Sequence, residues 1–222
     1  MRNEEIYGYI DHTLLKATST WEQIKALCDE AVKYQTASVC IPPAYISRVR
    51  KEYGEGFNIC TVIGFPLGYN TTSVKAFEAE DAIRKGADEI DMVINLGDVK
   101  NGEFDKVEDE IKTVKAACGK HILKVIIETC YLTEQEKISL CRAVTNAGAD
   151  FIKTSTGFGT AGATIEDINL FKANMGENVR MKAAGGVKSK ADIEMFIEAG
   201  CTRIGTSSAI KILTGEENKN EY

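Results

Sequence analysis

The sequence predicts an α/β fold in which a single domain forms a (β/α)8 barrel. Strand-sized apolar segments alternate with helical segments, eight strand candidates can be placed, and three helix-to-strand junctions share one pattern. A chain of 222 residues is long enough to bury the core of one such barrel, and it suits two smaller domains less well. Periodicity alone leaves an open doubly wound sheet as the alternative to a closed barrel.

The strand candidates are short apolar or alternating segments that lie between helical segments. They are residues 8–11, 38–41, 58–63, 89–95, 122–128, 151–155, 180–183 and 203–206. Helical connections between successive strands are what a parallel sheet requires, because parallel strands cannot be joined by tight hairpins.

A repeated junction consists of a helix end, a glycine and then a strand. Residues 82–91, 144–153 and 197–205 align in this way on Gly86, Gly148 and Gly200. Glycine suits the left-handed position that closes a helix, and the periodicity after it changes from helical to alternating. Residues 31–40 form a fainter copy, in which Gln35 stands at the glycine position.

Capping boxes mark three helix starts. In each, a hydroxyl side chain and a carboxylate or amide three residues later satisfy free backbone groups. The pairs are Thr20 with Gln23, Thr133 with Glu136, and Ser189 with Asp192. Each pair follows a strand candidate, as the alternation of strands and helices requires.

The composition excludes several classes of function. The 27 basic and 33 acidic residues give a formal charge of −6, and no basic stripe is dense enough to follow nucleic acid. The longest apolar runs, such as residues 122–127, are strand-sized, and the N-terminus lacks a signal peptide pattern. We therefore expect a cytoplasmic protein that binds neither nucleic acid nor membranes. We expect one domain over residues 1–222, with residues 215–222 as a flexible, polar tail.

The cysteines and histidines argue against a metal centre. The seven cysteines form an odd set without a CxxC motif, as expected of reduced thiols. His12 and His121 are the only histidines, whereas catalytic zinc and iron sites usually draw on several imidazole ligands. We therefore expect neither a metal nor another cofactor.

Functional side chains are expected at one register of the repeated junctions. Asp91, Lys153 and Gly205 share the same offset from their glycines, and Cys40 falls in the same register. Apolar residues alternate with them, so this register should face the barrel interior and the alternate one the helices. Active sites of such barrels lie at the C-terminal ends of the strands, where these residues are found.

Two lysines are predicted to be neighbours in this site. Lys153 lies near the end of one strand candidate and Lys182 near the end of the next. Two buried ammonium groups repel each other, so at least one should lose its proton, its pKa falling from about 10.4 to roughly 7–8. A neutral amine is a nucleophile, and Asp91 could offset part of the charge and relay protons. The alternative is that both lysines are ordinary ion-paired or snorkelling residues.

Two glycine-containing loops follow the last two strand candidates. One contains Gly185, Gly186 and Lys188 and leads into a helix, and the other contains Ser207 and Ser208. Backbone amides, a helix N-terminus and a cation together suit an anion, and barrel enzymes often bind phosphate at these two loops. The pair of loops predicts a phosphorylated ligand, although either loop alone could be a simple turn.

Five segments, in this order and spacing, resemble the deoxyribose-phosphate aldolase family. They are residues 10–14 (IDHTL), 89–95 (EIDMVIN), 123–129 (LKVIIET), 151–157 (FIKTSTG) and 182–187 (KAAGGV), and the similarity runs along essentially the whole chain. The resemblance implies a (β/α)8, or TIM, barrel and a class I aldolase, which is a carbon–carbon lyase.

The resemblance also implies roles for individual residues. Lys153 matches the lysine that forms the Schiff base, Lys182 the second lysine, Asp91 the aspartate of the proton relay, and Tyr222 a terminal tyrosine used in proton exchange. The implied substrate-binding residues are Asp11, Thr13, Cys40, Gly157, Gly185, Gly186, Lys188, Ser207 and Ser208.

Several of these positions have structural alternatives. Asp11 and Thr13 could simply end a strand, and Cys40 could be a packed small side chain. Phe158 departs from family members that carry lysine there, so phosphate binding would rest more on amides and Lys188. Lys124 and Glu128 are expected to lie behind the site, where a plain buried ion pair is the alternative.

The reaction implied by the resemblance is the reversible cleavage of 2-deoxy-D-ribose 5-phosphate to D-glyceraldehyde 3-phosphate and acetaldehyde, in deoxyribose phosphate and nucleotide catabolism. It requires no cofactor, and the dimers common among relatives allow a homodimer. The alternatives are another Schiff-base aldolase, a phosphosugar isomerase or epimerase that uses Asp91 as a base and Lys153 as a clamp, and a non-catalytic phosphosugar-binding module.

Overall fold

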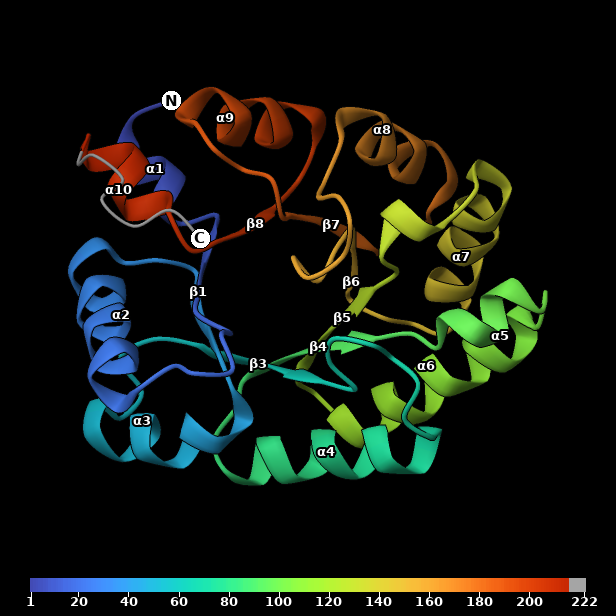
Figure 1. The fold of residues 1–222 in the computed structure, drawn as a ribbon, viewed down its shortest axis with the longest axis horizontal. Helices are drawn as coiled ribbons and strands as arrows, with labels where there is room; N and C mark the ends of the chain where they lie inside the picture. The colour runs from blue at the N-terminus through green and yellow to red at the C-terminus, as the bar shows by residue number, and fades with distance from the viewer. Residues whose placement is uncertain (216–222) are drawn as a thin grey trace.

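Eight parallel strands close into a barrel in the computed structural model, which describes residues 1–215 (Figure 1). The strands are β1 (Ile10–Thr13), β2 (Ser38–Ile41), β3 (Ile59–Ile63), β4 (Glu89–Val93), β5 (Ile122–Ile126), β6 (Phe151–Lys153), β7 (Arg180–Ala184) and β8 (Arg203–Thr206). Each strand pairs with the next in the sequence, and β8 pairs with β1. The predicted closed barrel is confirmed, and the open sheet is wrong.

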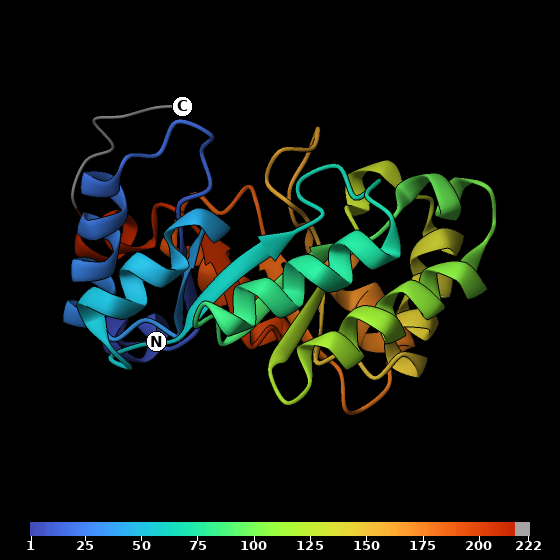
Figure 2. The same cartoon turned by 90° about the horizontal axis from the view of Figure 1, so that it is seen from below.

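Helices surround the barrel as an outer ring (Figures 1 and 2). They are α1 (Asn3–Tyr7), α2 (Trp21–Tyr34), α3 (Ile46–Tyr53), α4 (Thr72–Arg84), α5 (Leu96–Lys100), α6 (Phe104–Cys118), α7 (Glu134–Asn146), α8 (Ile165–Asn174), α9 (Lys190–Ala199) and α10 (Ala209–Thr214). Two 3₁₀ turns, η1 (Pro43–Tyr45) and η2 (Thr129–Tyr131), follow β2 and β5. The helices cover the outer faces of the strands and leave the two ends of the barrel for loops.

The helix ends follow the local sequence signals. The three predicted capping boxes are formed at the starts of α2, α7 and α9. Gly86, Gly148 and Gly200 have left-handed backbone conformations, with φ angles of 108°, 71° and 115°. Gln35, at the corresponding position of the fainter copy, has a φ of 55°. The repeated junction is therefore a conformational repeat, and one member tolerates a side chain at the glycine position.

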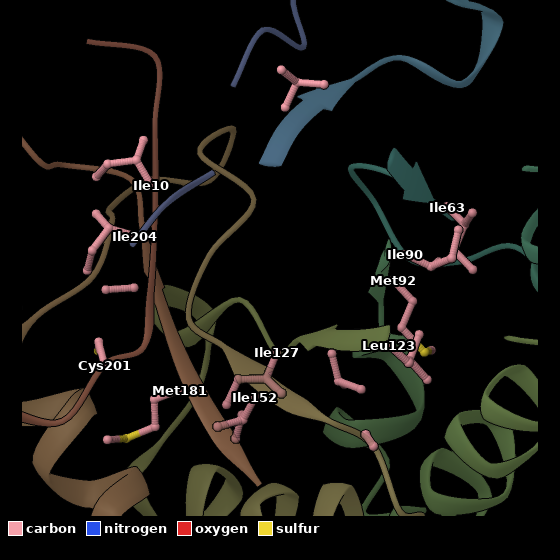
Figure 3. Packing of buried hydrophobic residues seen from close by; sticks show 14 of the residues in the cluster. Ile10, Ile63, Ile90, Met92, Leu123, Ile127, Ile152, Met181, Cys201 and Ile204 are labelled. Atoms are coloured by element: carbon pink, nitrogen blue, oxygen red, sulfur yellow. The ribbon is translucent and has the colours of Figure 1, made fainter. Parts of the chain in front are cut away.

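The main hydrophobic core lies between the strands and the helices. Ile90, Ile152 and Ile204 are fully buried within it (Figure 3). The same cluster includes residues from the inner faces of the helices. These side chains alternate along the strands with the predicted inward register. The barrel interior is therefore left to a separate set of residues, and most of that set is polar or charged.

Several strands end earlier than the periodicity predicts. The candidate at residues 89–95 ends at Val93, that at 122–128 ends at Ile126, and that at 151–155 ends at Lys153. The residues beyond still hydrogen-bond to neighbouring strands, for example Ile127 N to the Lys153 carbonyl oxygen (3.1 Å). Most of these residues, including Ile94, Ile127 and Thr154, remain buried at the C-terminal end of the barrel.

A buried ion pair joins α4 to α6 outside the barrel interior. Lys75 Nζ donates to Glu110 Oε1 and to the Val93 carbonyl oxygen, each at 2.8 Å. Burial lowers the pKa of Lys75 and raises that of Glu110, although each partner opposes the shift of the other. The pair fixes the end of β4 from the helix side.

Membrane insertion has no support in the helices described. Within residues 1–215, none combines the length and the apolar character needed to cross a bilayer. The proposed tail residue Tyr222 lies outside the described residues, as does nearly all of the tail predicted at residues 215–222.

We predict that two opposite substitutions, at Gly148 and at Gln35, measure the energetic cost of a side chain at the left-handed position of the repeated junction. Gly148→Gln should lower the free energy of unfolding by about 1–2 kcal/mol, because a side chain is disfavoured at positive φ. No atom lies within 4 Å of a Cβ built at Gly148, so steric clash would not contribute.

The reverse change, Gln35→Gly, should raise the free energy of unfolding slightly, since glycine relieves the strain but adds entropy to the unfolded chain. Urea denaturation of both variants checks this pair. Destabilisation by both changes would contradict it.

Candidate active site

Asp91 is the centre of a buried charged cluster inside the barrel. Its Oδ2 accepts hydrogen bonds from Lys153 Nζ at 2.8 Å and from Lys182 Nζ at 2.7 Å. Its Oδ1 accepts from Lys124 Nζ at 2.8 Å and from the Cys60 thiol at 3.1 Å. One carboxylate thus holds three amines from three successive strands, β5, β6 and β7.

The three amines differ in how many carboxylates they meet. Lys124 Nζ lies 2.6 Å from Glu89 and 3.5 Å from Asp11, in addition to Asp91. Lys182 Nζ lies 2.5 Å from Asp11 as well as 2.7 Å from Asp91. For Lys153 the ion pair is with Asp91 alone among residues 1–215, and its side chain is 4% exposed whereas the other two are 0% exposed. Lys153 is therefore the least constrained amine and the one closest to solvent.

A deeper layer of charges closes the cluster at the start of the strands. Arg203 on β8 forms two bonds of 2.8 Å with the two oxygens of Glu89, and a third of 2.6 Å with Asp11 Oδ1. Asp11 also accepts from the Ser38 hydroxyl at 2.8 Å. Lys124 joins this layer to Asp91, so the charged contacts are continuous from Arg203 to Lys153.

The network sets the protonation of its members. Burial alone would raise the pKa of Asp91, but Lys124, Lys153 and Lys182 together hold it well below its ordinary value. Burial alone would lower the pKa of Lys182, but Asp11 and Asp91 raise it. For Lys124 too, burial alone would lower the pKa, but Asp11 and Asp91 raise it. The two carboxylates therefore favour the ammonium form of Lys182. The expectation that at least one of the two lysines loses its proton stays a prediction.

The charges of the cluster do not balance when every group is ionised. The ion pairs described above join four cationic side chains to three carboxylates. An excess buried charge is unfavourable unless one group changes its protonation. Release of one proton from one amine would make the cluster neutral, and the contacts single out Lys153 as the amine with the fewest anions.

Two buried thiols line the same interior. Cys40 and Cys60 are register partners on β2 and β3. A hydrogen bond from Cys60 lowers the pKa of the Cys40 thiol, whereas burial raises that of Cys60 well above its ordinary value. Together with Val62 they form a small apolar cluster against Leu15 and Phe65. Cys40 is thus fully buried beside the charged cluster.

Within residues 1–215, the thiols and carboxylates of this interior also form the groups of side chains that are spaced closely enough to hold a metal ion. Cys40, Cys60 and Asp91 have ligand atoms within 4.8 Å of one another, as do Asp11, Cys60 and Glu89. A divalent cation at either set would compete with the ammonium and guanidinium groups already bound to these carboxylates. The arrangement therefore fits a cation-rich organic site better than a metal site.

The loops after β6 and β7 pack against each other beside the lysine strands. Gly157, after β6, lies against Gly185, after β7, and Gly162 packs on Gly185 so closely that an added Cβ would approach the Gly185 carbonyl carbon to 2.3 Å. Gly205 leaves room for Lys182, since a Cβ there would lie 3.1 Å from Lys182 Cε. Figure 2 shows the loop after β6 rising on the same side of the barrel as the loop after β3.

The remaining predicted site residues lie at or near this end. Gly186, Lys188 and Ser207 are exposed, and Ser208 is half-buried at the start of α10. Thr13 is half-buried at the end of β1, and its hydroxyl donates to the Asp11 carbonyl oxygen at 2.7 Å. Their backbone or hydroxyl groups are available at the rim while Asp11 stays inside the cluster.

Two members of the cluster were missed in the sequence. Glu89 and Arg203 lie two residues before Asp91 and Gly205, and so they face the same way on their strands. The period-two pattern could have found them. Ser155 was also missed: its buried Oγ has no hydrogen-bond partner within residues 1–215, and its Cβ lies 3.7 Å from where a Cβ on Gly185 would be.

The chain is similar to known aldolases over nearly its whole length. A family model described as DeoC/LacD family aldolase matches residues 6–211. A deoxyribose-phosphate aldolase of Clostridium botulinum (strain Alaska E43 / Type E3) is 60% identical over 219 residues, covering 99% of each chain. One of Clostridioides difficile (strain 630) is 63% identical over 215 residues, covering 96% of this chain and 98% of that relative. Among solved structures, the tetrameric deoxyribose phosphate aldolase of Aeropyrum pernix is 32% identical with a TM-score of 0.86, covering 96% of this chain and 91% of that one.

We predict that Lys124→Met lowers the free energy of unfolding by about 3–5 kcal/mol, because the change removes a buried ammonium that contacts Asp11, Glu89 and Asp91 together. Chemical denaturation measures this loss. Lys106→Met is the control: Lys106 also pairs with two carboxylates, but it is exposed and should contribute little. Equal effects of the two changes would contradict the importance of the buried cluster.

Proposed function

The chain belongs to the DeoC/LacD family of aldolases, and we propose that it acts on 2-deoxy-D-ribose 5-phosphate with Lys153 as the Schiff-base lysine. In this reaction the enzyme is a carbon–carbon lyase that reversibly releases D-glyceraldehyde 3-phosphate and acetaldehyde. The observation that carries the assignment of Lys153 is its position: its amine is held by Asp91 alone and has the only exposure among the three cluster lysines of the described chain.

The cluster supports nucleophilic attack by Lys153. An amine must be unprotonated to add to a carbonyl, and Asp91 Oδ2, which lies 2.8 Å from Lys153 Nζ, can take part in moving that proton. Lys182, bound to the same oxygen, remains cationic and can donate a hydrogen bond to the substrate or to a water. The two lysines thus have different roles because their carboxylate partners differ.

The proposed chemistry uses the imine as an electron sink. Lys153 adds to C1 of the open-chain sugar, and loss of water gives a protonated imine. Removal of the proton from the C3 hydroxyl then lets the C2–C3 bond break, with its electron pair passing into an enamine and glyceraldehyde 3-phosphate leaving. Protonation of the enamine at C2 and hydrolysis release acetaldehyde and free Lys153. The steps are additions to carbon, eliminations and proton transfers, all of which side chains and water can support.

We assign the proton transfers to Asp91, Lys182 and water. These groups share one hydrogen-bonded oxygen, so a proton taken at one position can be returned at another. Tyr222 stays a candidate for protonation of the enamine, and it lies outside the described residues. Asp11 would hold Lys182 in place from the opposite side, at 2.5 Å.

We propose that the loops after β6, β7 and β8 bind the phosphate. Gly157, Gly185 and Gly186 would offer backbone amides, and Ser207 and Ser208 hydroxyls and amides at the start of α10. Lys188, exposed beside the second loop, would add a positive charge. The loops adjoin the lysine strands, so a sugar with its aldehyde at Lys153 would reach them with its far end. Thr13 and Cys40, on the β1 and β2 side, would border the aldehyde end.

The proposal extends to the location and the oligomeric state of the enzyme. We propose a cytoplasmic enzyme of deoxyribose phosphate catabolism that works as a homodimer and needs no cofactor. Sedimentation analysis of the purified chain tests the dimer, and a tetramer, as in the relative from Aeropyrum pernix, would replace it.

We predict that borohydride traps the intermediate on Lys153. Reduction in the presence of acetaldehyde should leave an N-ethyl group on this residue. Reduction with 2-deoxyribose 5-phosphate should leave either the reduced phosphosugar or, after cleavage, the N-ethyl group, and peptide mass mapping locates both. Lys75 is the internal control, because it is equally buried but lies in the α4–α6 ion pair. Labelling of Lys182 or Lys75 instead would overturn the assignment, and turnover without any trapped lysine would favour an isomerase or epimerase.

We further predict that Lys153→Arg abolishes turnover. A guanidinium keeps the positive charge and can still pair with Asp91, but it stays protonated and cannot form an imine. Steady-state assays of cleavage, with circular dichroism to confirm folding, measure the effect. Turnover near the level of the unmodified enzyme would show that Lys153 acts only as an electrostatic clamp.

A further inference from the structure

Glu128 occupies an unusual position just beyond β5. Its φ of 53° makes it, with Gln35, one of the two residues other than glycine with a positive φ in the described chain. It is 2% exposed. A buried carboxylate in a disfavoured backbone conformation needs compensating interactions, and such positions concentrate at functional sites.

The compensation comes from the loop after the Lys153 strand. Glu128 Oε1 accepts from the Thr156 backbone N–H at 3.1 Å, and Oε2 accepts a short hydrogen bond from the Thr156 hydroxyl. The adjacent Thr129 N–H donates to the Thr154 carbonyl oxygen at 2.9 Å. Both the side chain and the backbone at this turn are therefore bound to residues 154–156.

Thr156 also fixes the backbone of the residues that follow it. Its Oγ1 accepts from the Phe158 N–H at 2.9 Å, which closes a tight turn around Gly157. Gly159 then comes so close that an added Cβ would lie 3.1 Å from the Glu128 carboxylate carbon and 2.9 Å from Cys130 Sγ. The loop from Thr156 to Gly159 is thus shaped around the Glu128 carboxylate.

The opposite side of this loop meets the glycines after β7. The Ala163 N–H donates to the carbonyl oxygens of Ala184 and Gly185, at 3.1 and 3.2 Å. Gly157 Cα lies 3.7 Å from where a Cβ of Gly185 would be. The direction of the Gly157 amide therefore depends on contacts from β7 on one side and on Glu128 on the other.

Phe158 extends the same loop toward the β3 side of the barrel. Its ring packs edge to face against Phe65, with the centroids 5.4 Å apart, although it is 55% exposed. The turn held by Thr156 therefore also sets where this aromatic side chain lies at the mouth of the barrel.

We propose that Glu128 is a positioning residue that sets the preference of the enzyme for phosphorylated substrates. Resting on the function proposed above, the inference is that its carboxylate, through Thr156, holds the Gly157 amide in the direction that a phosphate group requires. Glu128 does not touch the reacting carbon atoms, so its loss should weaken recognition of the phosphate while the aldol chemistry at Lys153 continues.

The test compares 2-deoxyribose 5-phosphate with unphosphorylated 2-deoxyribose. Glu128→Gln keeps the size of the side chain but replaces one of the two accepting oxygens by a donor, so the charge-assisted bond that the Thr156 hydroxyl donates to Oε2 is lost. We expect kcat/KM for the phosphorylated sugar to fall by about 10- to 100-fold, mainly through KM, whereas kcat/KM for 2-deoxyribose changes by less than about 3-fold. Inorganic phosphate should also become a weaker competitive inhibitor.

Thr156→Val approaches the same contact from the other partner and removes the hydroxyl alone. Because the hydroxyl also accepts from the Phe158 N–H, the selective loss should be at least as large as in Glu128→Gln. The double variant should lose little more than Thr156→Val alone, since both changes break the bond between Glu128 and Thr156. This variant also keeps the test available if Glu128→Gln folds poorly, which thermal unfolding reveals.

The matched control is Glu110→Gln. Glu110 is likewise a buried glutamate and accepts from a backbone N–H, that of Asn95, at 3.2 Å, but it pairs with Lys75 away from the loop. A purely structural effect should change both substrates by the same factor, as expected for this control.

Equal losses with both sugars in Glu128→Gln and Thr156→Val, or no loss in either, would overturn the positioning role. Failure of the unmodified enzyme to cleave 2-deoxyribose 5-phosphate would instead contradict the proposed function, so the two failures are distinguishable.

Discussion

The sharing of one carboxylate by three amines is the interaction on which the site depends. Asp91 binds Lys124 through one oxygen and both Lys153 and Lys182 through the other. In a low-dielectric interior such an anion is needed to keep several lysines together at all, and the unequal supply of further carboxylates then distinguishes them. Lys182 and Lys124 are stabilised as cations, and Lys153 is left as the amine with the fewest carboxylates around it. The same contacts that allow the charges to be buried thus divide the roles among them.

Much of the architecture could be predicted from the chain because its signals are local. The glycine at the end of each helix, the capping boxes and the alternation of apolar residues each act within a few positions, and Gly148, Thr133 and Ile152 behave in the structure as these rules require. The direction of Lys153 follows from the alternation of side chains along a strand: because Ile152 faces the helices, Lys153 faces the barrel interior. Strand ends were less predictable, because residues beyond Lys153, such as Thr154 and Ser155, stay buried after the strand has ended.

The electrostatics of the site could not be predicted in the same way. Repulsion between Lys153 and Lys182 was evident from their adjacency, but its outcome depends on Asp11, which reaches Lys182 from the far end of the sequence. The period-two pattern indicates that Arg203 and Glu89 face the interior, but it does not indicate their pairing, which joins β8 to β4 across the barrel. Likewise, nothing in residues 122–128 indicates that Glu128 turns left-handed and binds Thr156, because that conformation is stabilised only by a loop that follows the next strand.

The continuity of charge from Arg203 to Lys153 has a consequence for how this barrel can change over evolution. In many barrels the end away from the catalytic loops carries stability alone, so the two ends can vary separately. Here a substitution at the floor would alter the electrostatic potential at the mouth through Glu89, Lys124 and Asp91. The charged residues inside the barrel therefore couple its stability to its chemistry. A change of substrate specificity would require compatible residues at both ends of the barrel.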